Sequence, residues 1–258
     1  MFCAAGLMLS SLTVSGDITR SRSTASTTPA VIEGVSPFWT PLYSMVIGGG
    51  FEYQSDSERT EYGFPFLIEY NFSERTRLTI EPNFAHITDK TEGGRSVSGF
   101  GDLATLLSYE FLSERRYRPA VSMEGGIRWP TASNSELGEE GHDYSLGLLA
   151  SKDLVFVNLD LNFIYNFIGV PGESDTVEVS LATAWRLNHY VEFIAEVTTV
   201  QPTGNARSPG STGGRETEGL IGLAWQVNRR LKLEQGVVFK EHGVQEFVFA
   251  WEWSFGGD

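Results

Sequence analysis

Charged side chains recur at every second position within long apolar stretches of this chain. Asp160 stands between two leucines, and Glu178 stands between two valines. If such a stretch is a strand, its alternate side chains point to opposite faces, so the charges share one face and the apolar residues share the other. A charged face of this kind could line a water-filled pore, where carboxylates favour the passage of cations.

This alternation assigns fourteen carboxylates and five bases to the charged face. Our candidate site is a pore constriction formed by the central members of this set: Glu81, Glu124, Asp160, Glu196, Arg77, Arg128 and Arg186. The three arginines are the natural organisers, because a buried ion without a partner is costly. Our hypothesis is that Arg128, with Glu124 and neighbouring carboxylates, forms the constriction. The alternative is that the charges pair with one another and plug the interior.

Nucleophilic chemistry has little support in the sequence. Cys3 is the single cysteine, so the body of the chain has no disulfide framework and no cysteine nucleophile or zinc ligand. His142 and Ser145 are three residues apart, so on a strand they face opposite ways and cannot form a local nucleophile–base pair. His142 and His242 lie in predicted outer loops and could meet only across the barrel. A lipid-modifying hydrolase is therefore kept as an alternative function.

Two other motifs point to ligands only weakly. The acidic stretch 135–143 lacks the ligand spacing of a calcium loop. The glycines at 48–50 and 99–101 do not continue into Gly-Lys-Ser/Thr and do not open a helix, so they are not phosphate-binding loops. We therefore expect no metal and no cofactor, and read 135–143 as a solvated loop.

Composition narrows the class of partner. The chain has 258 residues and a net charge of −14, which argues against nucleic acid because such a partner calls for a basic face. No stretch reaches the roughly 18 consecutive apolar residues of a membrane helix.

The elements that would position the charges are strands. From Tyr43 onward the hydrophobic period is two, and most of the alternating segments span 11 to 14 residues. Soluble strands usually have about 5–6 residues, whereas a tilted membrane-spanning strand needs about 9–11. We predict twelve strands, at 43–54, 60–72, 76–88, 98–111, 117–129, 142–153, 155–167, 175–187, 189–200, 215–227, 230–240 and 244–255.

The connections alternate between short and long. Short turns are expected after the second, fourth, sixth, eighth and tenth strands, whereas 89–98, 131–141 and 201–214 are long and rich in Gly, Ser and charge. Transmembrane barrels have short turns at the periplasmic rim and longer loops outside. With an even number of strands, both termini are expected at the periplasmic side.

The apolar faces are too bulky for the interior of a barrel. The last segment, FVFAWEWSF (247–255), has five aromatic residues on one face, and the other face is small or charged. Twelve such faces would overfill an interior, so we expect them to face lipid. Aromatic residues near strand ends match the interfacial girdles of outer-membrane barrels.

The chain divides into three parts by composition. Residues 1–16 resemble the end of a secretory signal peptide that lacks its basic start. Residues 17–42 are rich in Ser, Thr and Pro and are expected to form a flexible lead-in. Residues 43–258 form the predicted barrel.

Three stretches resemble a known family: GFGDLATLLSYEFL (99–112), RPAVSMEGGIRWPTAS (118–133) and DYSLGLLASKDL (143–154). They are similar to bacterial outer-membrane proteins named for the meta-pathway of phenol degradation, which are described as transporters. The shared motifs are short strand and turn residues, such as Gly101-Asp102-Leu103 and Pro130-Thr131. The resemblance implies passage of small, aromatic or hydrophobic, compounds across the outer membrane.

The sequence thus predicts an all-β protein, a transmembrane antiparallel β-barrel of about twelve strands with periplasmic termini, in the bacterial outer membrane. Its expected function is passive, porin-like transport of small compounds, without enzymatic activity. Outer-membrane lipid, a small-molecule solute and the barrel-assembly machinery are the expected partners, and the oligomeric state is left open. The alternatives are a plugged structural barrel and an outer-membrane hydrolase.

Overall fold

The computed structural model is all-β, and it describes most of the chain from Met45 onward. The described residues there are 45–55, 59–89, 94–139, 141–171, 173–203, 215–240 and 245–255. Before Met45 it describes only four two-residue strands, which pair as β1 (Met8–Leu9) with β4 (Ala30–Val31) and β2 (Gly16–Asp17) with β3 (Ser21–Arg22). The signal peptide and lead-in predicted for 1–16 and 17–42 therefore fall largely outside the described residues and stay predictions.

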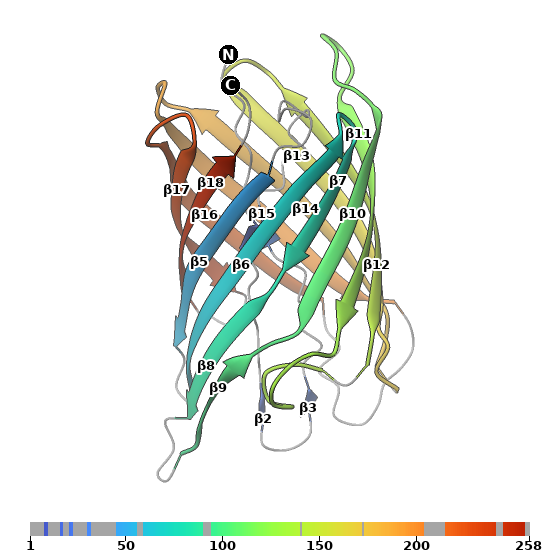
Figure 1. Ribbon diagram of the computed structural model, residues 1–258, viewed down its shortest axis with the longest axis vertical. Coiled ribbons are helices and arrows are strands. Elements are labelled where there is room, and N and C mark those ends of the chain that lie inside the picture. The colour runs from blue at the N-terminus through green and yellow to red at the C-terminus, as the bar shows by residue number, and fades with distance from the viewer. Residues whose placement is uncertain are drawn as a thin grey trace.

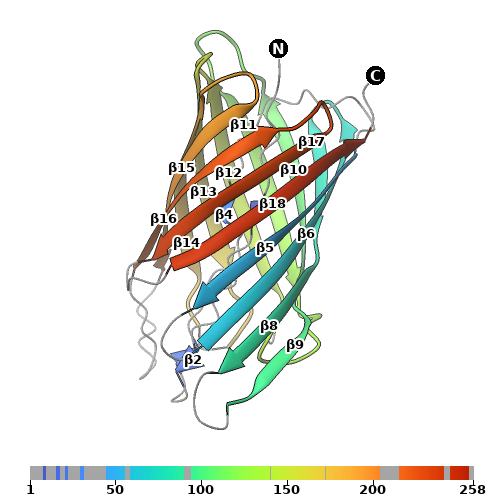
Figure 2. The same cartoon turned by 90° about the vertical axis from the view of Figure 1, so that its left-hand side faces the viewer.

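One antiparallel sheet closes on itself to form the barrel (Figures 1 and 2). The first strand, β5 (Met45–Ser55), pairs along its length with the last, β18 (Gln245–Phe255), which confirms the predicted closure. The remaining strands are β6 (Arg59–Ser73), β7 (Thr76–Glu81), β8 (Asn83–Asp89), β9 (Ser96–Phe100), β10 (Leu103–Leu112), β11 (Ala120–Trp129), β12 (Asp143–Asp153), β13 (Val157–Phe167), β14 (Thr176–Arg186), β15 (Val191–Pro202), β16 (Glu216–Gln226) and β17 (Leu231–Lys240).

The sheet has fourteen labelled segments but twelve barrel strands. β7 and β8 are two parts of one strand, as are β9 and β10, so 14 − 2 gives twelve, as predicted. The breaks lie opposite each other, at Pro82 and at Gly101–Asp102. Pro82 has no N–H to donate to a ladder, and one extra residue opposite it is accommodated as a bulge. The predicted strands 76–88 and 98–111 are therefore each interrupted once.

The two ends of the barrel differ in their connections. Turns of a few residues join the strands at the end where β5 begins and β18 ends, hereafter the short-turn end. Asn188 and Asn228 shape two of these turns in the same way, because each side-chain Oδ1 accepts the backbone N–H groups two and three residues later. The connection 130–142 lies at the opposite, long-loop end.

The apolar side chains face outward and the charged ones inward. In β18, Phe247 and Phe255 are 45% and 41% exposed, whereas Glu246 and Glu252 are each 2% exposed. The aromatic face of the last strand is therefore on the outside of the barrel, as predicted. The described residues include no helix of the length and apolarity needed to cross a membrane.

Aromatic residues gather on the outer face near the strand ends. Trp185 and Phe193 stack across neighbouring strands with their ring centroids 5.3 Å apart. The other large exposed aromatics within a few residues of a strand end include Phe72, Tyr109, Phe111, Trp129, Tyr144, Phe167 and Phe255. Such girdles mark the two membrane interfaces of outer-membrane barrels.

Candidate functional site

The inner face of the barrel is acidic. Each of the fourteen carboxylates assigned to it by alternation is buried or half-buried, which confirms the predicted direction of these side chains: Glu52, Glu69, Glu81, Asp102, Glu110, Glu124, Asp160, Glu178, Glu192, Glu196, Glu218, Glu234, Glu246 and Glu252. The five predicted bases, Arg77, Arg128, Arg186, Lys232 and Lys240, are half-buried or buried as well.

Arg128 is the centre of an ionic cluster at the long-loop end. Its Nη2 donates to the carboxylates of Glu139 and Asp143, and its Nη1 lies 3.6 Å from Oδ2 of Asp102. Asp143 is the direct cross-strand neighbour of Arg128 on β12. The arginine is only 10% exposed, so its charge is neutralised largely by these three carboxylates.

The structure does not bring Arg128 and Glu124 together. The two residues are four apart on β11, and therefore about 13 Å apart along the strand. Glu124 lies opposite Ser108 of β10, whose hydroxyl donates to it at 2.5 Å. Cross-strand register, rather than proximity in sequence, selects the partners of both side chains.

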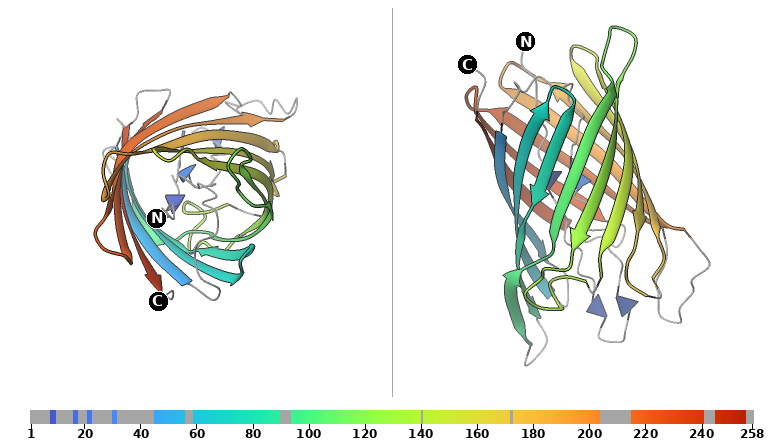
Figure 3. Two further views of the ribbon diagram at one scale, coloured as in Figure 1. Left: turned by 90° about the horizontal axis from the view of Figure 1, so that it is seen from above. Right: turned by 45° about the vertical axis from the view of Figure 1, so that its right-hand side comes forward.

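Asp102 fastens the loop that follows β11 to the barrel wall. Its Oδ1 accepts the backbone N–H of Ala132 at 3.1 Å, and its Oδ2 accepts that of Glu139 at 2.9 Å. Gly138 packs so closely that a Cβ there would lie 2.6 Å from Oδ1 of Asp102. We call residues 131–139 the inner loop, because Figure 3 shows this connection turning in beneath the ring of strands.

Leu137 is the apolar anchor of the inner loop. It is 1% exposed and packs against Ala85 and Ile87 on the inner face of β8. The stretch 135–143 is therefore only partly solvated among its described residues, because Leu137 and Asp143 are buried whereas Ser135 and Glu136 are exposed.

The other inward bases are also bound to carboxylates. Arg77 lies 3.1 Å from Glu69, and Arg186 contacts Asp153 at 2.9 Å and Glu192 at 3.6 Å. The pairs Lys232–Glu234 and Lys240–Glu246 have N–O distances of 2.5 and 2.7 Å. Lys152, whose position on β12 has outward parity, lies 2.5 Å from Glu114 near the short-turn end. Each of these cations is thus fixed in place at the wall.

The central carboxylates are held by neutral donors. Asp160 accepts the side-chain amide of Asn158 at 2.7 Å, and Glu196 accepts the hydroxyl of Thr198 at 3.0 Å. Glu81 and Glu196 each keep one buried oxygen with no hydrogen-bond partner among the described residues. The middle of the inner wall is therefore acidic, and the predicted constriction residues are spread over several strands rather than gathered around one arginine.

The sequence analysis missed part of this network: Glu114, Glu139, Asp143, Lys152 and Asp153. Asp143 has the inward parity of its strand, because its neighbour Tyr144 is exposed, so alternation could have placed it. Glu139 lies in a loop, where no period applies.

A serine–histidine contact lies on the hairpin of β8 and β9. Nε2 of His86 is 3.3 Å from the hydroxyl of Ser96 and 3.1 Å from that of Thr88. Both hydroxyls contact the same ring nitrogen. No described carboxylate bonds the other ring nitrogen, Nδ1. His142 instead packs its ring edge-on to Trp129, with the ring centroids 5.5 Å apart. Neither arrangement is a catalytic triad.

Among the described residues, no group of three or more His, Cys, Asp or Glu side chains is placed to hold a metal ion.

The sequence profile of one family matches most of the chain. This family is described as "Putative MetA-pathway of phenol degradation", and the match spans residues 43–245. The chain belongs to this family. A search of curated proteins finds no match to the sequence.

Solved structures share the fold of this family member. A COG4313 outer membrane channel from Pseudomonas putida F1 superimposes with a TM-score of 0.68 at 12% identity, covering 85% of this chain and 98% of the other. The NanC porin gives a TM-score of 0.60 at 10% identity, with coverages of 80% and 98%. The KdgM porin gives 0.58 at 10% identity, with coverages of 81% and 99%. At these identities the likeness shows a common barrel fold.

Proposed function

We propose that the protein is a porin-like channel of the bacterial outer membrane through which small compounds, aromatic ones among them, diffuse passively. One observation carries the proposal. The chain forms a closed twelve-stranded barrel with an apolar outer face and a charged inner face. Membrane barrels have this polarity, whereas soluble barrels have the reverse. The family name and the channels and porins that share the fold support it.

On this proposal, outer-membrane lipid surrounds the barrel and the solute passes inside it. The short-turn end faces the periplasm, as in other outer-membrane barrels, and the assembly machinery inserts the chain. No covalent step is needed, because selectivity comes from the width and the charge of the pore. The proposal holds for a monomer and for an oligomer alike.

The constriction in this proposal has two parts, the Arg128 cluster at the long-loop end and acidic residues further along the inner wall. Arg128 and Asp102 together hold the inner loop against the wall at the long-loop end. Glu81, Glu124, Asp160 and Glu196 contribute acidic charge further along the wall. Arg77 holds Glu69, and Arg186 holds Asp153 and Glu192. Such a pore favours cations.

The test is electrical. The full chain would be refolded into a planar lipid bilayer, and its conductance and reversal potential would be measured in a gradient of potassium chloride. We expect discrete conductance steps and a reversal potential on the cation-selective side. Absence of conductance in a correctly folded barrel would overturn the channel and favour a plugged structural barrel.

A further inference from the structure

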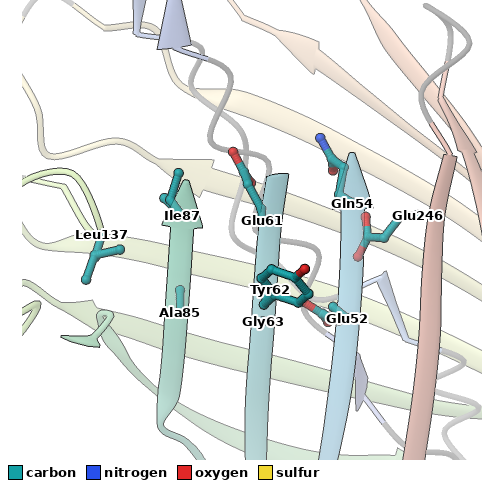
Figure 4. A pocket seen from close by; sticks show the side chains of 9 residues that line it. All are labelled: Glu52, Gln54, Glu61, Tyr62, Gly63, Ala85, Ile87, Leu137 and Glu246. Atoms are coloured by element: carbon teal, nitrogen blue, oxygen red, sulfur yellow. The ribbon is translucent and has the colours of Figure 1, made fainter. Parts of the chain in front are cut away.

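A pocket opens on the inner wall near the long-loop end (Figure 4). Its enclosed core has room for about one water molecule, and its space widens to about 350 Å³ when the part open to solvent is counted. Four adjacent strands and the inner loop supply its lining: Glu246 from β18, Glu52 and Gln54 from β5, Glu61, Tyr62 and Gly63 from β6, Ala85 and Ile87 from β8, and Leu137.

Small residues create the hollow. Glu52 is paired in register with Gly63, and Gly63 is paired with Ala85, so two neighbouring inward positions carry almost no side chain. A Cβ at Gly63 would lie 2.6 Å from Oε2 of Glu52. The glutamate therefore lies across the glycine, and the space beside it depends on that missing side chain.

Glu52 is a buried carboxylate that lacks a full set of partners. It is 4% exposed, and its Oε1 makes no hydrogen bond in the described part of the chain. The nearby base, Lys240, is already engaged, because its Nζ donates to Glu246 at 2.7 Å and to Gln54 at 2.9 Å. A buried ion in this condition is stabilised by a cationic donor.

The opposite side of the pocket is apolar. Ala85, Ile87 and Leu137 form one buried cluster, with Leu137 supplied by the loop that Asp102 holds in place. A ligand that satisfies both sides has a cationic donor at one end and a short apolar body at the other.

We propose that this pocket binds a small organic cation, a protonated amine with a short aliphatic or aromatic body. The ammonium group donates to Oε1 of Glu52, and the apolar body lies against Ile87 and Leu137. The proposal adds a class of solute to the proposed channel function. It rests on that function only because the channel is the route by which the solute reaches the pocket.

Binding of 2-phenylethylammonium to the refolded full chain in detergent, measured by titration calorimetry, tests the site. We expect Glu52→Gln to weaken binding about tenfold or more, because a charge-assisted hydrogen bond becomes a neutral one. Glu110→Gln is the matched control, since Glu110 is 3% exposed and lies outside the pocket. This control is expected to bind like wild type.

Two further measurements test the two sides of the pocket separately. Gly63→Ala places a methyl group against Glu52 and is expected to weaken binding as well, so the test does not depend on one variant. Ammonium chloride is expected to bind more weakly than 2-phenylethylammonium, because it leaves the apolar wall uncovered. Equal affinities for the two ligands would contradict an amphipathic ligand.

The outcomes separate this site from the channel. Equal affinity in wild type and Glu52→Gln overturns the site. Conductance in a bilayer without any binding of the amine overturns the site and leaves the channel standing. Binding that depends on Glu52 in a protein that does not conduct supports the site and overturns the channel.

Discussion

Arg128 donates to the carboxylate of Asp143, the residue directly opposite it on the next strand. The same guanidinium reaches Glu139 at the end of the inner loop and Asp102 at the break between β9 and β10. One cation therefore links the barrel wall, a broken strand and an inward-folded loop. Its loss would disturb both the stability of the barrel and the width of its long-loop mouth.

Replacing Arg128 by alanine is expected to destabilise the folded barrel by about 3–5 kcal/mol, because three carboxylates would lose their common partner in a poorly solvated place. Unfolding by urea in lipid vesicles measures this change. Arg128→Lys keeps the charge but loses the forked geometry, so it should fall between wild type and alanine. Equal stability of all three proteins would show that the cluster contributes nothing to folding.

Replacing Asp102 by alanine is expected to release the inner loop and raise the single-channel conductance. The substitution leaves the N–H groups of Ala132 and Glu139 without their acceptor, at a cost of about 1–3 kcal/mol. Glu110→Ala is the matched control, because it removes a buried inward carboxylate that does not touch the loop. An unchanged conductance in Asp102→Ala would show that the loop does not narrow the current path.

The strands and their two faces could be predicted from sequence because the period of two runs through nearly every segment. The outward Phe247 and the inward Glu246, for example, follow from parity alone. The same rule assigns the central carboxylates to the interior, and it holds because one face of every strand meets an apolar surrounding.

The inner loop could not be predicted in this way. The loop is held by Asp102, which lies at the break at Gly101–Asp102. This break faces Pro82 only when the third and fourth barrel strands, β7–β8 and β9–β10, have paired. The choice of Asp143 over Glu124 as partner of Arg128 depends on cross-strand register, which alternation does not specify. Loop residues such as Glu139 do not follow the alternation of a strand, so their contacts can be identified only from the folded structure.

Val155 is expected to be a strained position whose replacement by glycine stabilises the protein. It has φ of 74°, in the left-handed region that a β-branched residue avoids, within the turn between β12 and β13. Glycine should relieve the strain and stabilise the barrel by about 1 kcal/mol, net of its own entropic cost. Urea unfolding measures the change, and Val157→Gly, at the start of the following strand, should have the opposite sign.

The Ser96–His86 contact is expected to have no hydrolytic activity. Nε2 of His86 is shared between two hydroxyls, and no described carboxylate orients the ring from its other nitrogen. Purified protein should not release fatty acid from phospholipid vesicles above the background of empty vesicles. Release that disappears in Ser96→Ala would instead establish the hydrolase alternative.

The outer face of β13 offers a direct test of whether the barrel lies in lipid. Leu161, near the middle of the strand, and Phe167, at its end, share that face and are 51% and 46% exposed. Arginine costs about 2–4 kcal/mol at the middle of a bilayer but only about 0–1 kcal/mol near its interfaces. Leu161→Arg should therefore destabilise the barrel in lipid vesicles far more than Phe167→Arg does. In a water-soluble barrel both positions would face solvent, and neither substitution would lower the free energy of unfolding appreciably. The difference in the free energy of unfolding between the two variants thus shows whether the middle of β13 lies in the lipid core. This readout does not depend on any conductance.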